Sequence, residues 1–411
     1  MVNADKKADI LPDTGVLRDG AETTDLMEPL LIGESSRHRN HLTDLALELA
    51  QESAAFRHSL PDSLVSSLAE LVRAMNCYYS NLIEGHDTHP VDIERALKRN
   101  YSNDPQKRDL QKEAAAHIGV QKWIDGGGLN GQEVTTVGIC EVHRRFCEFL
   151  PNDMLFVQDP HTGERIPVVP GELRQRDVSV GRHVPISPGA LPRFLQRFQS
   201  VYGQLGKMDT LIGVAAAHHR LLWIHPFLDG NGRVARLMSH AMLLRLLDTG
   251  AIWSAARGLA RKVEDYKAHL ADCDTLRRNY YDGRGNLSEE ALAEFTKFFL
   301  EICIDQVKFM QSLIRPDGLR ERIVLWAEEE IGRGNLPPKS ANVLKALLYR
   351  GNLPRADVAM TVGSTERHAR RVVASLSERG VLASQGPRDP WRLVFPAALA
   401  SRWMPGLFPE K

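Results

Sequence analysis

The sequence contains no stretch that would place the chain in a membrane or send it out of the cell. None of its apolar runs approaches the roughly 18 residues that a membrane-spanning helix requires. Residues 1–7 are mostly polar, and no apolar signal region follows them. The sequence therefore predicts a protein that has no membrane partner, and the expected location is cytoplasmic.

Cysteine is scarce, and its distribution excludes two kinds of structural site. The chain has an odd and scattered set of cysteines, namely Cys77, Cys140, Cys147, Cys273 and Cys303. No Cys-x-x-Cys pair occurs, so neither a zinc site nor a disulfide framework is indicated. The chain also lacks an internal repeat and a net charge, since 52 Lys and Arg face 52 Asp and Glu. This cysteine usage is typical of a protein in a reducing cytoplasm.

The most informative feature that is present is the segment 225–236, His-Pro-Phe-Leu-Asp-Gly-Asn-Gly-Arg-Val-Ala-Arg. Residues 208–224 before it are rich in alanine and leucine, and residues 234–247 after it have apolar positions at helical spacing. The glycines interrupt this pattern, so a helix–loop–helix is predicted. His225 titrates near neutral pH and can take a proton from a hydroxyl group. Asp229 is a hard oxygen ligand suited to Mg²⁺.

The loop of this segment has the features of a phosphate site. The first backbone N–H groups of a helix lack intrahelical partners, and the helix dipole places partial positive charge there. Gly230 and Gly232 have no Cβ, so a phosphate can approach the backbone closely. Arg233 and Arg236 are three residues apart on one helix face, and guanidinium groups suit phosphate oxygens. Each feature alone is common in ordinary structure, but their order and spacing favour phosphate chemistry.

The segment resembles the signature of the Fic family, His-Pro-Phe-x-Asp/Glu-Gly-Asn-Gly-Arg-x-x-Arg, at every defined position. Fic proteins are all-helical transferases, and most move AMP from ATP to a Ser, Thr or Tyr hydroxyl of a protein and release pyrophosphate. The resemblance implies a protein adenylyltransferase in which His225 is the general base for the target hydroxyl. It also implies that Asp229 holds the metal, Mg²⁺ with Mn²⁺ as an alternative.

The same resemblance assigns the residues that bind ATP. Arg233 would support the phosphates and the loop, and Arg236 would reach the γ-phosphate. The residues between Asp229 and Arg233 would cradle the α- and β-phosphates; they are Gly230, Asn231 and Gly232. Because these groups recognise phosphates and not a base, a different nucleoside triphosphate donor stays open as an alternative.

A second motif, Ser80-Asn-Leu-Ile-Glu84-Gly85, resembles the inhibitory motif of the family, Ser/Thr-x-x-x-Glu-Gly/Asn. Residues 64–83 are helical in pattern, which places Ser80 and Glu84 on one face, with Gly85 as the stop. In the family the glutamate pairs with the second arginine of the signature, here Arg236, and occupies the place of the γ-phosphate. A carboxylate that competes with a phosphate for one guanidinium is a reasonable switch. The resemblance therefore implies a transferase inhibited by its own chain.

Two further elements complete the predicted ATP site. Apolar residues alternate on both sides of a turn in residues 178–185, which predicts a β-hairpin. It resembles the flap of Fic proteins, which pairs with an extended target segment and covers the nucleotide through residues that here are Val180, Gly181, Arg182 and His183. Main-chain pairing of this kind leaves target specificity loose. Residues 265–270 resemble the Tyr-Tyr-x-x-Leu segment beside the adenine, which leaves Tyr266 as the matching residue because Lys267 replaces the second aromatic.

Breaks in the pattern divide the chain into five predicted segments. They are a loose arm that docks only partly (1–34), a helical region with the inhibitory helix (35–125), the Fic core (126–315), a connecting helix and linker (316–338) and a C-terminal domain (339–411). The expected fold class is mainly α, a helical Fic fold with a β-hairpin flap and a C-terminal α+β domain.

The C-terminal domain resembles a winged helix-turn-helix. Helices are predicted over residues 340–349, 355–361 and 365–379, the third with Ser364 as its N-cap, and two short strands over 380–395. Residues 339–411 carry 12 Lys and Arg against 5 Asp and Glu, and such a basic face favours nucleic acid. The third helix would be the recognition helix, with Arg367, Arg370 and Arg371. Winged helices also serve as dimerisation or protein-docking modules.

Two classes of function therefore stay open. The first is a Mg²⁺-dependent protein adenylyltransferase whose partners are ATP and a target protein, with the chain itself as one candidate target. The second is a DNA-binding regulator whose Fic core only senses nucleotide. The intact signature favours the enzyme, since a silent core would be free to lose His225 or Asp229. A homodimer is a further expectation, because family members often dimerise through the core.

Overall fold

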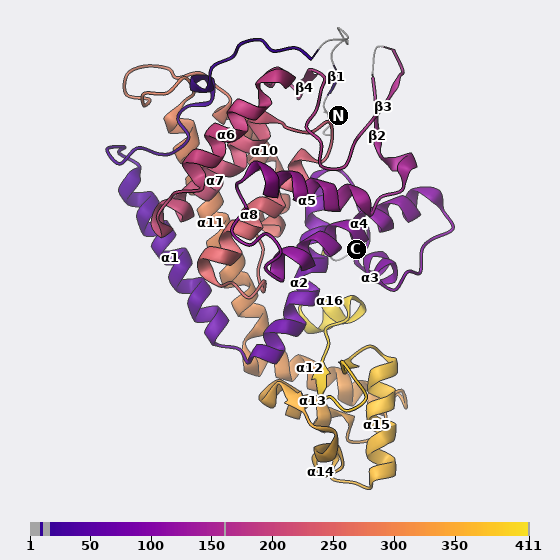
Figure 1. The fold of residues 1–411 in the computed structure, drawn as a ribbon. Helices are drawn as coiled ribbons and strands as arrows, with labels where there is room; N and C mark the ends of the chain where they lie inside the picture. Colours follow the sequence, from indigo (N-terminus) through magenta and orange to yellow (C-terminus); the bar gives the residue numbers. More distant parts are fainter. Residues whose placement is uncertain (1–8, 11–16, 160–161, 410–411) are drawn as a thin grey trace.

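The computed structural model of the protein describes residues 9–10, 17–159 and 162–409, and these are mainly helical (Figure 1). The helices up to the signature segment are α1 (Arg39–His58), α2 (Asp62–Ile83), α3 (Pro90–Leu97), α4 (Pro105–Asp125), α5 (Thr136–Glu148), α6 (Leu191–Tyr202) and α7 (Lys207–Ile224). The later ones are α8 (Asn231–Leu247), α9 (Ala255–Arg261), α10 (Val263–Cys273), α11 (Glu289–Ile314), α12 (Pro316–Gly332), α13 (Ser340–Arg350), α14 (Val358–Val362), α15 (Glu366–Glu378) and α16 (Ala400–Trp403). Within the described residues, no helix is long and apolar enough to cross a bilayer.

Helices α7 and α8 form the helix–loop–helix that the sequence predicts for the signature segment. Helix α7 ends where His225 adopts a left-handed backbone conformation (φ 50°, ψ 64°), which breaks the helical hydrogen-bond pattern. Gly230, with φ 83°, precedes α8 in a conformation that L side chains rarely adopt. The loop between them is therefore short and tightly specified, and both helices around it are largely buried.

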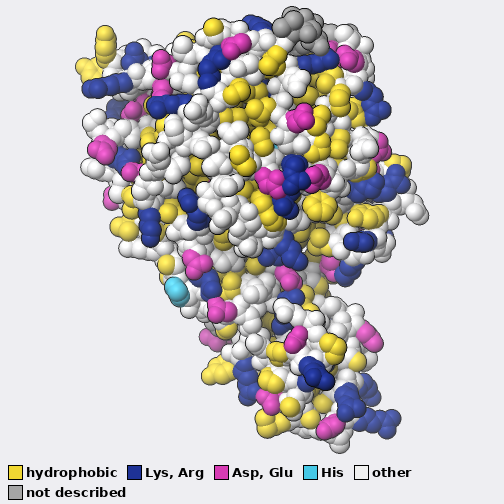
Figure 2. All heavy atoms as spheres, in the orientation of Figure 1, with side chains coloured by type: hydrophobic (Ala, Val, Ile, Leu, Met, Phe, Trp, Pro, Cys, Tyr) yellow, Lys and Arg dark blue, Asp and Glu magenta, His cyan; other side chains and the backbone are white. Residues whose placement is uncertain are grey.

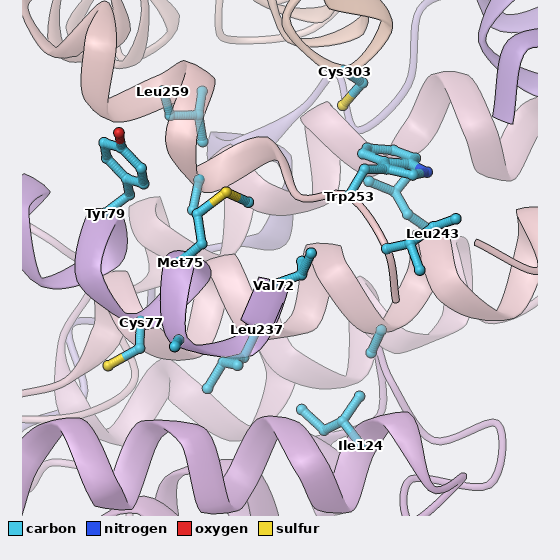
Figure 3. Close-up of a cluster of buried hydrophobic side chains, with 14 of the residues drawn as sticks. Val72, Met75, Cys77, Tyr79, Ile124, Leu237, Leu243, Trp253, Leu259 and Cys303 are labelled. Carbon is cyan, nitrogen blue, oxygen red and sulfur yellow. The ribbon is translucent and has the colours of Figure 1, made fainter. Parts of the chain in front are cut away.

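The predicted inhibitory helix, α2, lies in the middle of the core. It is apolar around most of its circumference, as expected for a helix that packs on several sides. Figure 3 shows Val72, Met75 and Tyr79 of α2 among side chains from several other helices, including Leu237 of α8 and Leu259 of α9. This packing fixes the position of the C-terminal end of α2, which lies beside the start of α8.

The described strands are short, and three of them lie between α5 and α6. Strands β2 (Phe156–Gln158) and β3 (Arg165–Pro167) form an antiparallel hairpin that the sequence analysis did not separate from the surrounding loop. In the flap, Val180 and His183 pair across a two-residue turn. The preceding strand β4 (Val178–Ser179) pairs antiparallel with β1 (Asp9–Ile10), so its partner comes from the N-terminal segment. Within the flap, the described pairing is therefore limited to Val180 and His183, whereas the sequence predicted a hairpin over residues 178–185.

The described part of the predicted loose arm, residues 9–10 and 17–34, is docked on the core. Glu22 accepts hydrogen bonds from the backbone N–H and the hydroxyl of Ser187, at 2.9 and 2.7 Å. Buried Arg220 donates to the carbonyl oxygen of Pro29 at 2.8 Å. Apolar side chains in this stretch are also buried, among them Met27, Leu30 and Ile32. The sequence did not indicate this docking because the contacts lie more than 150 residues away along the chain.

The C-terminal segment combines three helices with a small sheet. Helices α13, α14 and α15 pack with strands β5 (Asn352–Leu353), β6 (Leu382–Ala383) and β7 (Trp391–Leu393), whose spatial order is β5-β7-β6. The sequence predicted two of these strands and missed β5, which is only two residues long. The prediction of Ser364 as N-cap was wrong by one residue. Thr365 caps α15 because its hydroxyl accepts from the N–H of His368, three positions into the turn.

Four buried histidines predict how the stability of this fold depends on pH. Burial lowers the pKa of His117 and His218 to about 3, and that of His143 and His219 to about 4. Their pKa values in the unfolded chain are near 6.5, so below that pH the unfolded state binds protons that the folded state does not. We expect the free energy of unfolding to fall from pH 7.0 to 5.5 by roughly 1 kcal/mol for each of the four residues.

Urea unfolding at the two pH values measures this difference. Neither ring nitrogen of His117 has a hydrogen-bond partner among the described residues, so His117→Leu should reduce the pH dependence by one group's share without breaking a bond. An unfolding free energy that is equal or higher at pH 5.5 would contradict the prediction.

Candidate active site

The signature loop is held in shape by its own asparagine. The Asn231 side chain accepts a hydrogen bond from the N–H of Phe227 at 3.0 Å and donates to the Phe227 carbonyl at 2.8 Å. This side chain therefore takes the place of a main-chain hydrogen-bond partner for Phe227. It is buried. Asp229 accepts from the N–H of Gly230 at 2.7 Å. Gly230 has no side chain to cap α8, so the first N–H groups of the helix face the same cavity as His225.

The two arginines of the signature have different partners. Arg233 pairs with the buried carboxylate of Glu113 on α4 and, at 3.3 Å, with Asp229 one turn earlier. Arg236 donates from Nε to the Ser80 hydroxyl at 2.8 Å and from Nη2 to the Ser80 carbonyl at 3.2 Å. The same Nη2 pairs with Oε1 of Glu84. Both guanidinium groups are almost fully buried, so each is oriented by α2 or α4 and not by solvent.

Glu84 lies at the end of α2 and reaches across to the start of α8. A Cβ at Gly232 would lie 2.4 Å from Oε1 of Glu84, so the approach requires glycine at that position. Gly85, with φ 83°, lets the chain turn directly after Glu84. Burial by itself raises the pKa of the Glu84 carboxyl, but the adjacent Arg236 and Arg233 outweigh it and hold the pKa below its ordinary value. Glu84 is therefore an anion at neutral pH, in contact with Arg236.

These groups surround one cavity of about 280 Å³. The predicted site residues that line it are His225, Asp229, Gly230, Asn231, Gly232, Arg233, Arg236, Glu84, Val180, His183 and Tyr266. Gly181 and Arg182 form the exposed tip of the flap turn and do not line it. Ser80 lies behind Arg236, and Gly85 lies at the end of α2. The tertiary structure thus joins segments that are up to 180 residues apart in the sequence.

The cavity environment keeps His225 neutral. Burial is the main cause that lowers its pKa to about 3, and the cationic Arg174 and the ring of His183 add to the effect. The sequence-based expectation that His225 titrates near neutral pH is therefore wrong for this structure. The neutral ring has a free lone pair that can accept a hydrogen bond from a hydroxyl, but its low pKa makes it a weak base in this environment. His183 also lines the cavity, and its ring nitrogen hydrogen-bonds to the carbonyl of Trp223 at 2.8 Å.

Tyr266 is more deeply buried than expected for a side chain that stacks on the adenine base. It is 2% exposed, and its hydroxyl lies 2.6 Å from Nε2 of His218, which also contacts the hydroxyl of Ser239 at 2.9 Å. Its place in the cavity is therefore at the floor, beneath the arginines. Lys267, the departure from the family pattern, also lines the cavity, together with Asp274.

Sequence reasoning did not assign a role to Arg174, which joins the flap to the catalytic loop. Its backbone N–H donates to the carbonyl of Pro226 at 2.9 Å, and its side-chain Nε donates to the carbonyl of His225 at 2.8 Å. Its other nitrogens donate to the carbonyls of Arg176, at 2.9 Å, and Ile186. The guanidinium is buried, which lowers its pKa to about 10, so it remains a cation.

Glu113 and His86 were also not predicted. Glu113 accepts from Arg233 and lies 3.0 Å from Nδ1 of His86, two residues after Glu84. Burial alone would raise the pKa of Glu113, but Arg233 and His86 lower it to about 2. Neither residue belongs to a local motif. Only the packing of α4 against α8 brings Glu113 to the arginine, so no pattern in the sequence could have identified it.

The donor set fits a metal ion that is shared with a substrate. Among the described residues, no group of three or more His, Cys, Asp and Glu side chains could enclose a metal ion. Asp229 offers one carboxylate, which lines the cavity with a side chain that is 38% exposed. Mg²⁺ commonly binds to one or two carboxylates and takes its other ligands from phosphates and water. A single carboxylate beside a phosphate site therefore suits Mg²⁺, and no closed protein cage is needed.

Comparisons with known proteins agree with this geometry. Residues 133–243 match the model of the Fic/DOC family. The chain is 29% identical over 207 residues to a protein adenylyltransferase Fic of Drosophila grimshawi, and 29% identical over 209 residues to that of Drosophila willistoni. Each match covers 50% of this chain, and the chain spans about a third of each relative, 36% and 35%.

The fold agrees with a solved structure of this kind. A fragment of Fic-1 from C. elegans (residues 134–508) aligns with a TM-score of 0.50 at 16% sequence identity. The alignment covers 67% of this chain and 73% of the fragment. The motif, the helical architecture and the matched residues agree, and the chain therefore carries a Fic domain of the Fic/DOC family.

Proposed function

We propose that the protein is an adenylyltransferase that moves AMP from ATP to a Ser, Thr or Tyr hydroxyl of a protein. One observation carries the proposal: a single cavity contains a neutral imidazole, the uncapped N-terminus of α8 and two buried guanidinium groups. These are the groups that an in-line attack on a nucleotide phosphate requires. The names of the curated relatives support the same activity.

The proposed reaction assigns one role to each group. His225 takes the proton of the target hydroxyl while its oxygen forms a bond to the α-phosphorus of ATP. The bond from the α-phosphorus to the oxygen bridging to the β-phosphate breaks, and pyrophosphate leaves. The N–H groups around Gly230 and Gly232 hold the α- and β-phosphates, Arg233 supports these phosphates and the loop, and Arg236 reaches the γ-phosphate. Asn231 keeps the loop in this shape through its two bonds to Phe227.

Two further parts of the proposal concern the metal and the target. Asp229 would hold Mg²⁺, or Mn²⁺ in its place, which would neutralise phosphate charge when bound. The flap around Val180 and His183 would align an extended target segment by main-chain pairing. A donor other than ATP stays an alternative, because the phosphate-binding groups recognise no base and Lys267, which replaces the second aromatic of the family segment, lines the cavity.

We further propose that the resting protein inhibits itself through Glu84. The carboxylate occupies the guanidinium of Arg236, which the γ-phosphate of ATP would otherwise reach. Gly232 lies against the carboxylate, and Ser80 holds the buried arginine from behind. Hydrogen bonds to charged groups are worth about 1.5–3 kcal/mol, enough to oppose productive binding by one to two orders of magnitude.

The substitution Glu84→Gly tests the transfer and its inhibition together. We expect it to raise the incorporation of label from α-³²P-ATP into the protein itself by about 10- to 100-fold, since it frees Arg236 for the phosphate. Adding His225→Ala should remove the labelling, because no base then accepts the hydroxyl proton. Glu94→Ala, at a half-buried position of α3 that does not line the cavity, is the matched control and should label like the wild type. If the Glu84→Gly and His225→Ala double variant labels as strongly as the single one, the base is another residue.

Arg174 is expected to set the catalytic rate without binding ATP. It does not line the cavity, but it holds the carbonyl of His225, so Arg174→Lys should lower kcat by about 10-fold or more and leave KM for ATP nearly unchanged. Steady-state kinetics in the Glu84→Gly background separate the two constants. Arg165→Lys, on β3 and away from His225, is the control. A raised KM with an unchanged kcat would show that Arg174 acts on nucleotide binding instead.

A second proposal concerns the C-terminal segment, which we assign to a winged helix-turn-helix domain over residues 339–411. Helix α15 carries Arg367, Arg370 and Arg371 on exposed positions. On the face shown in Figure 2, Lys and Arg side chains gather on the lower lobe, where Figure 1 places this segment. An exposed basic helix suits the phosphate backbone of duplex DNA. This supports DNA as a partner of the protein, beside its proposed enzyme activity.

A mobility-shift assay with the full chain tests DNA binding. We expect retention of duplex DNA at about 50 mM salt that weakens steeply as salt rises, because released counterions drive such binding. Arg367→Ala with Arg371→Ala should reduce the retention, whereas Arg402→Ala, which removes a basic residue outside α15, should not. Absence of retention by the wild type at low salt would exclude this role.

A further inference from the structure

The inhibitory helix α2 has a second set of partners on the C-terminal segment, far from the catalytic centre. In Figure 1 the C-terminal segment lies below the core. Strand β7 and the tail after α16 both reach α2, so they contact the element that presents Ser80 and Glu84 to Arg236. A change at these contacts can therefore move the inhibitory residues.

The first contact lies directly before the inhibitory motif. The hydroxyl of Tyr79, a buried residue, donates to the carbonyl of Leu407 at 3.1 Å. Its neighbour Tyr78 packs edge-to-face on Phe408, with ring centroids 5.8 Å apart. Arg257 donates to the carbonyl of Gly406 at 2.9 Å. The tail is therefore bound next to Ser80. A shift of α2 at this contact would also move Ser80.

The second contact lies in the first half of α2. Arg392 of β7 donates to the Glu70 carboxylate at 3.1 Å and to the Ser67 hydroxyl at 3.3 Å. Close by, a Cβ at Gly351 would lie 1.9 Å from the hydroxyl of Ser63, so the backbone before β5 lies directly against α2. The two contacts are about three helical turns apart, so together they fix both the tilt and the rotation of α2.

The tail is itself anchored to the rest of the C-terminal segment. Trp403 is buried and packs edge-to-face on Trp326 of α12, with centroids 5.2 Å apart, and on Phe395 after β7, at 6.0 Å. Arg322 of α12 donates to the carbonyl of Trp403 at 2.6 Å. Because sheet, tail and α12 are connected, displacement of the C-terminal segment would withdraw both contacts from α2.

We propose that the C-terminal segment, residues 339–409, is a latch that holds α2 in its inhibitory position, so that release of this segment activates AMP transfer. The latch stabilises the state in which Glu84 occupies Arg236, and a ligand that binds the released segment would shift the equilibrium toward the active state. The inference rests on the proposed function, since it gives a second layer of control to the same site.

A full-length variant with a weakened latch tests the proposal. It combines Tyr79→Phe, Arg392→Ala and Phe408→Ala. These changes remove two sets of hydrogen bonds and one ring contact without touching the cavity. We expect self-labelling from α-³²P-ATP to rise at least about fivefold over the wild type, the factor associated with one net hydrogen bond. Arg355→Ala is the matched control, since Arg355 packs on Trp391 in the same segment, 4.2 Å from its ring. It should label like the wild type.

The Glu84→Gly variant separates failure of the latch from failure of the proposed function. If Glu84→Gly labels and the latch-weakened protein stays at the wild-type level, the latch is wrong and the transferase stands. If Glu84→Gly does not label, the proposed function itself fails. Adding the latch changes to Glu84→Gly should give no further rise, because the latch acts through Glu84. A clear further rise would overturn that coupling.

Amide hydrogen exchange of the latch-weakened protein gives a readout that does not depend on activity. If the triple variant does not fold, the single variant Tyr79→Phe can be used for this measurement. We expect faster exchange at the amides of residues 78–85 than in the wild type, with unchanged exchange in α7 and α8. Unchanged exchange over 78–85, or an equal increase throughout the core, would overturn the proposal.

Discussion

The guanidinium of Arg236 is the group on which the rest of the site depends. It is a buried cation, and a buried charge must be compensated by partners because solvent cannot stabilise it. Ser80 satisfies two of its donors permanently from behind, while Glu84 satisfies a third from the cavity side. The first pair fixes the arginine in place, and in the proposed mechanism the second contact is exchanged for a phosphate. Under that proposal, one side chain is both part of the scaffold and the point where Glu84 and ATP compete.

The surrounding charges make this exchange reversible without unfolding the site. Arg233 stays balanced by Glu113 and Asp229 whichever anion faces Arg236, and His86 stabilises Glu113 in turn. The loop keeps its shape through the two bonds of Asn231 to Phe227 and through Arg174 under His225. Only Glu84 therefore has to move, and it lies at the end of a helix, where a small rotation gives the largest displacement. Under the proposed latch, contacts made along α2 by the C-terminal segment would act on the site through this helix end.

Local patterns in the sequence were sufficient for the elements whose structure depends on near neighbours. The apolar spacing of residues 208–247 and the two glycines predict the helix–loop–helix, because helical periodicity and left-handed turns are properties of a few consecutive residues. The same patterns failed for β5 and for the pairing of β4 with β1, since a two-residue strand carries no periodic signal of its own. Arg174, Glu113 and the docked residues 17–34 were missed for a related reason, as their partners lie far away along the chain.

The sequence by itself determined the chemistry available to this protein: an imidazole, a carboxylate, a glycine loop and two arginines in one short segment, with a separate Ser-x-x-x-Glu-Gly motif upstream. Only the tertiary structure decided which of these groups meet. It placed Glu84 on Arg236 and Glu113 on Arg233, and it buried His225 enough to lower its pKa to about 3. The physical reason is that residue type and local spacing are encoded along the chain, whereas burial and long-range charge pairing arise when helices pack.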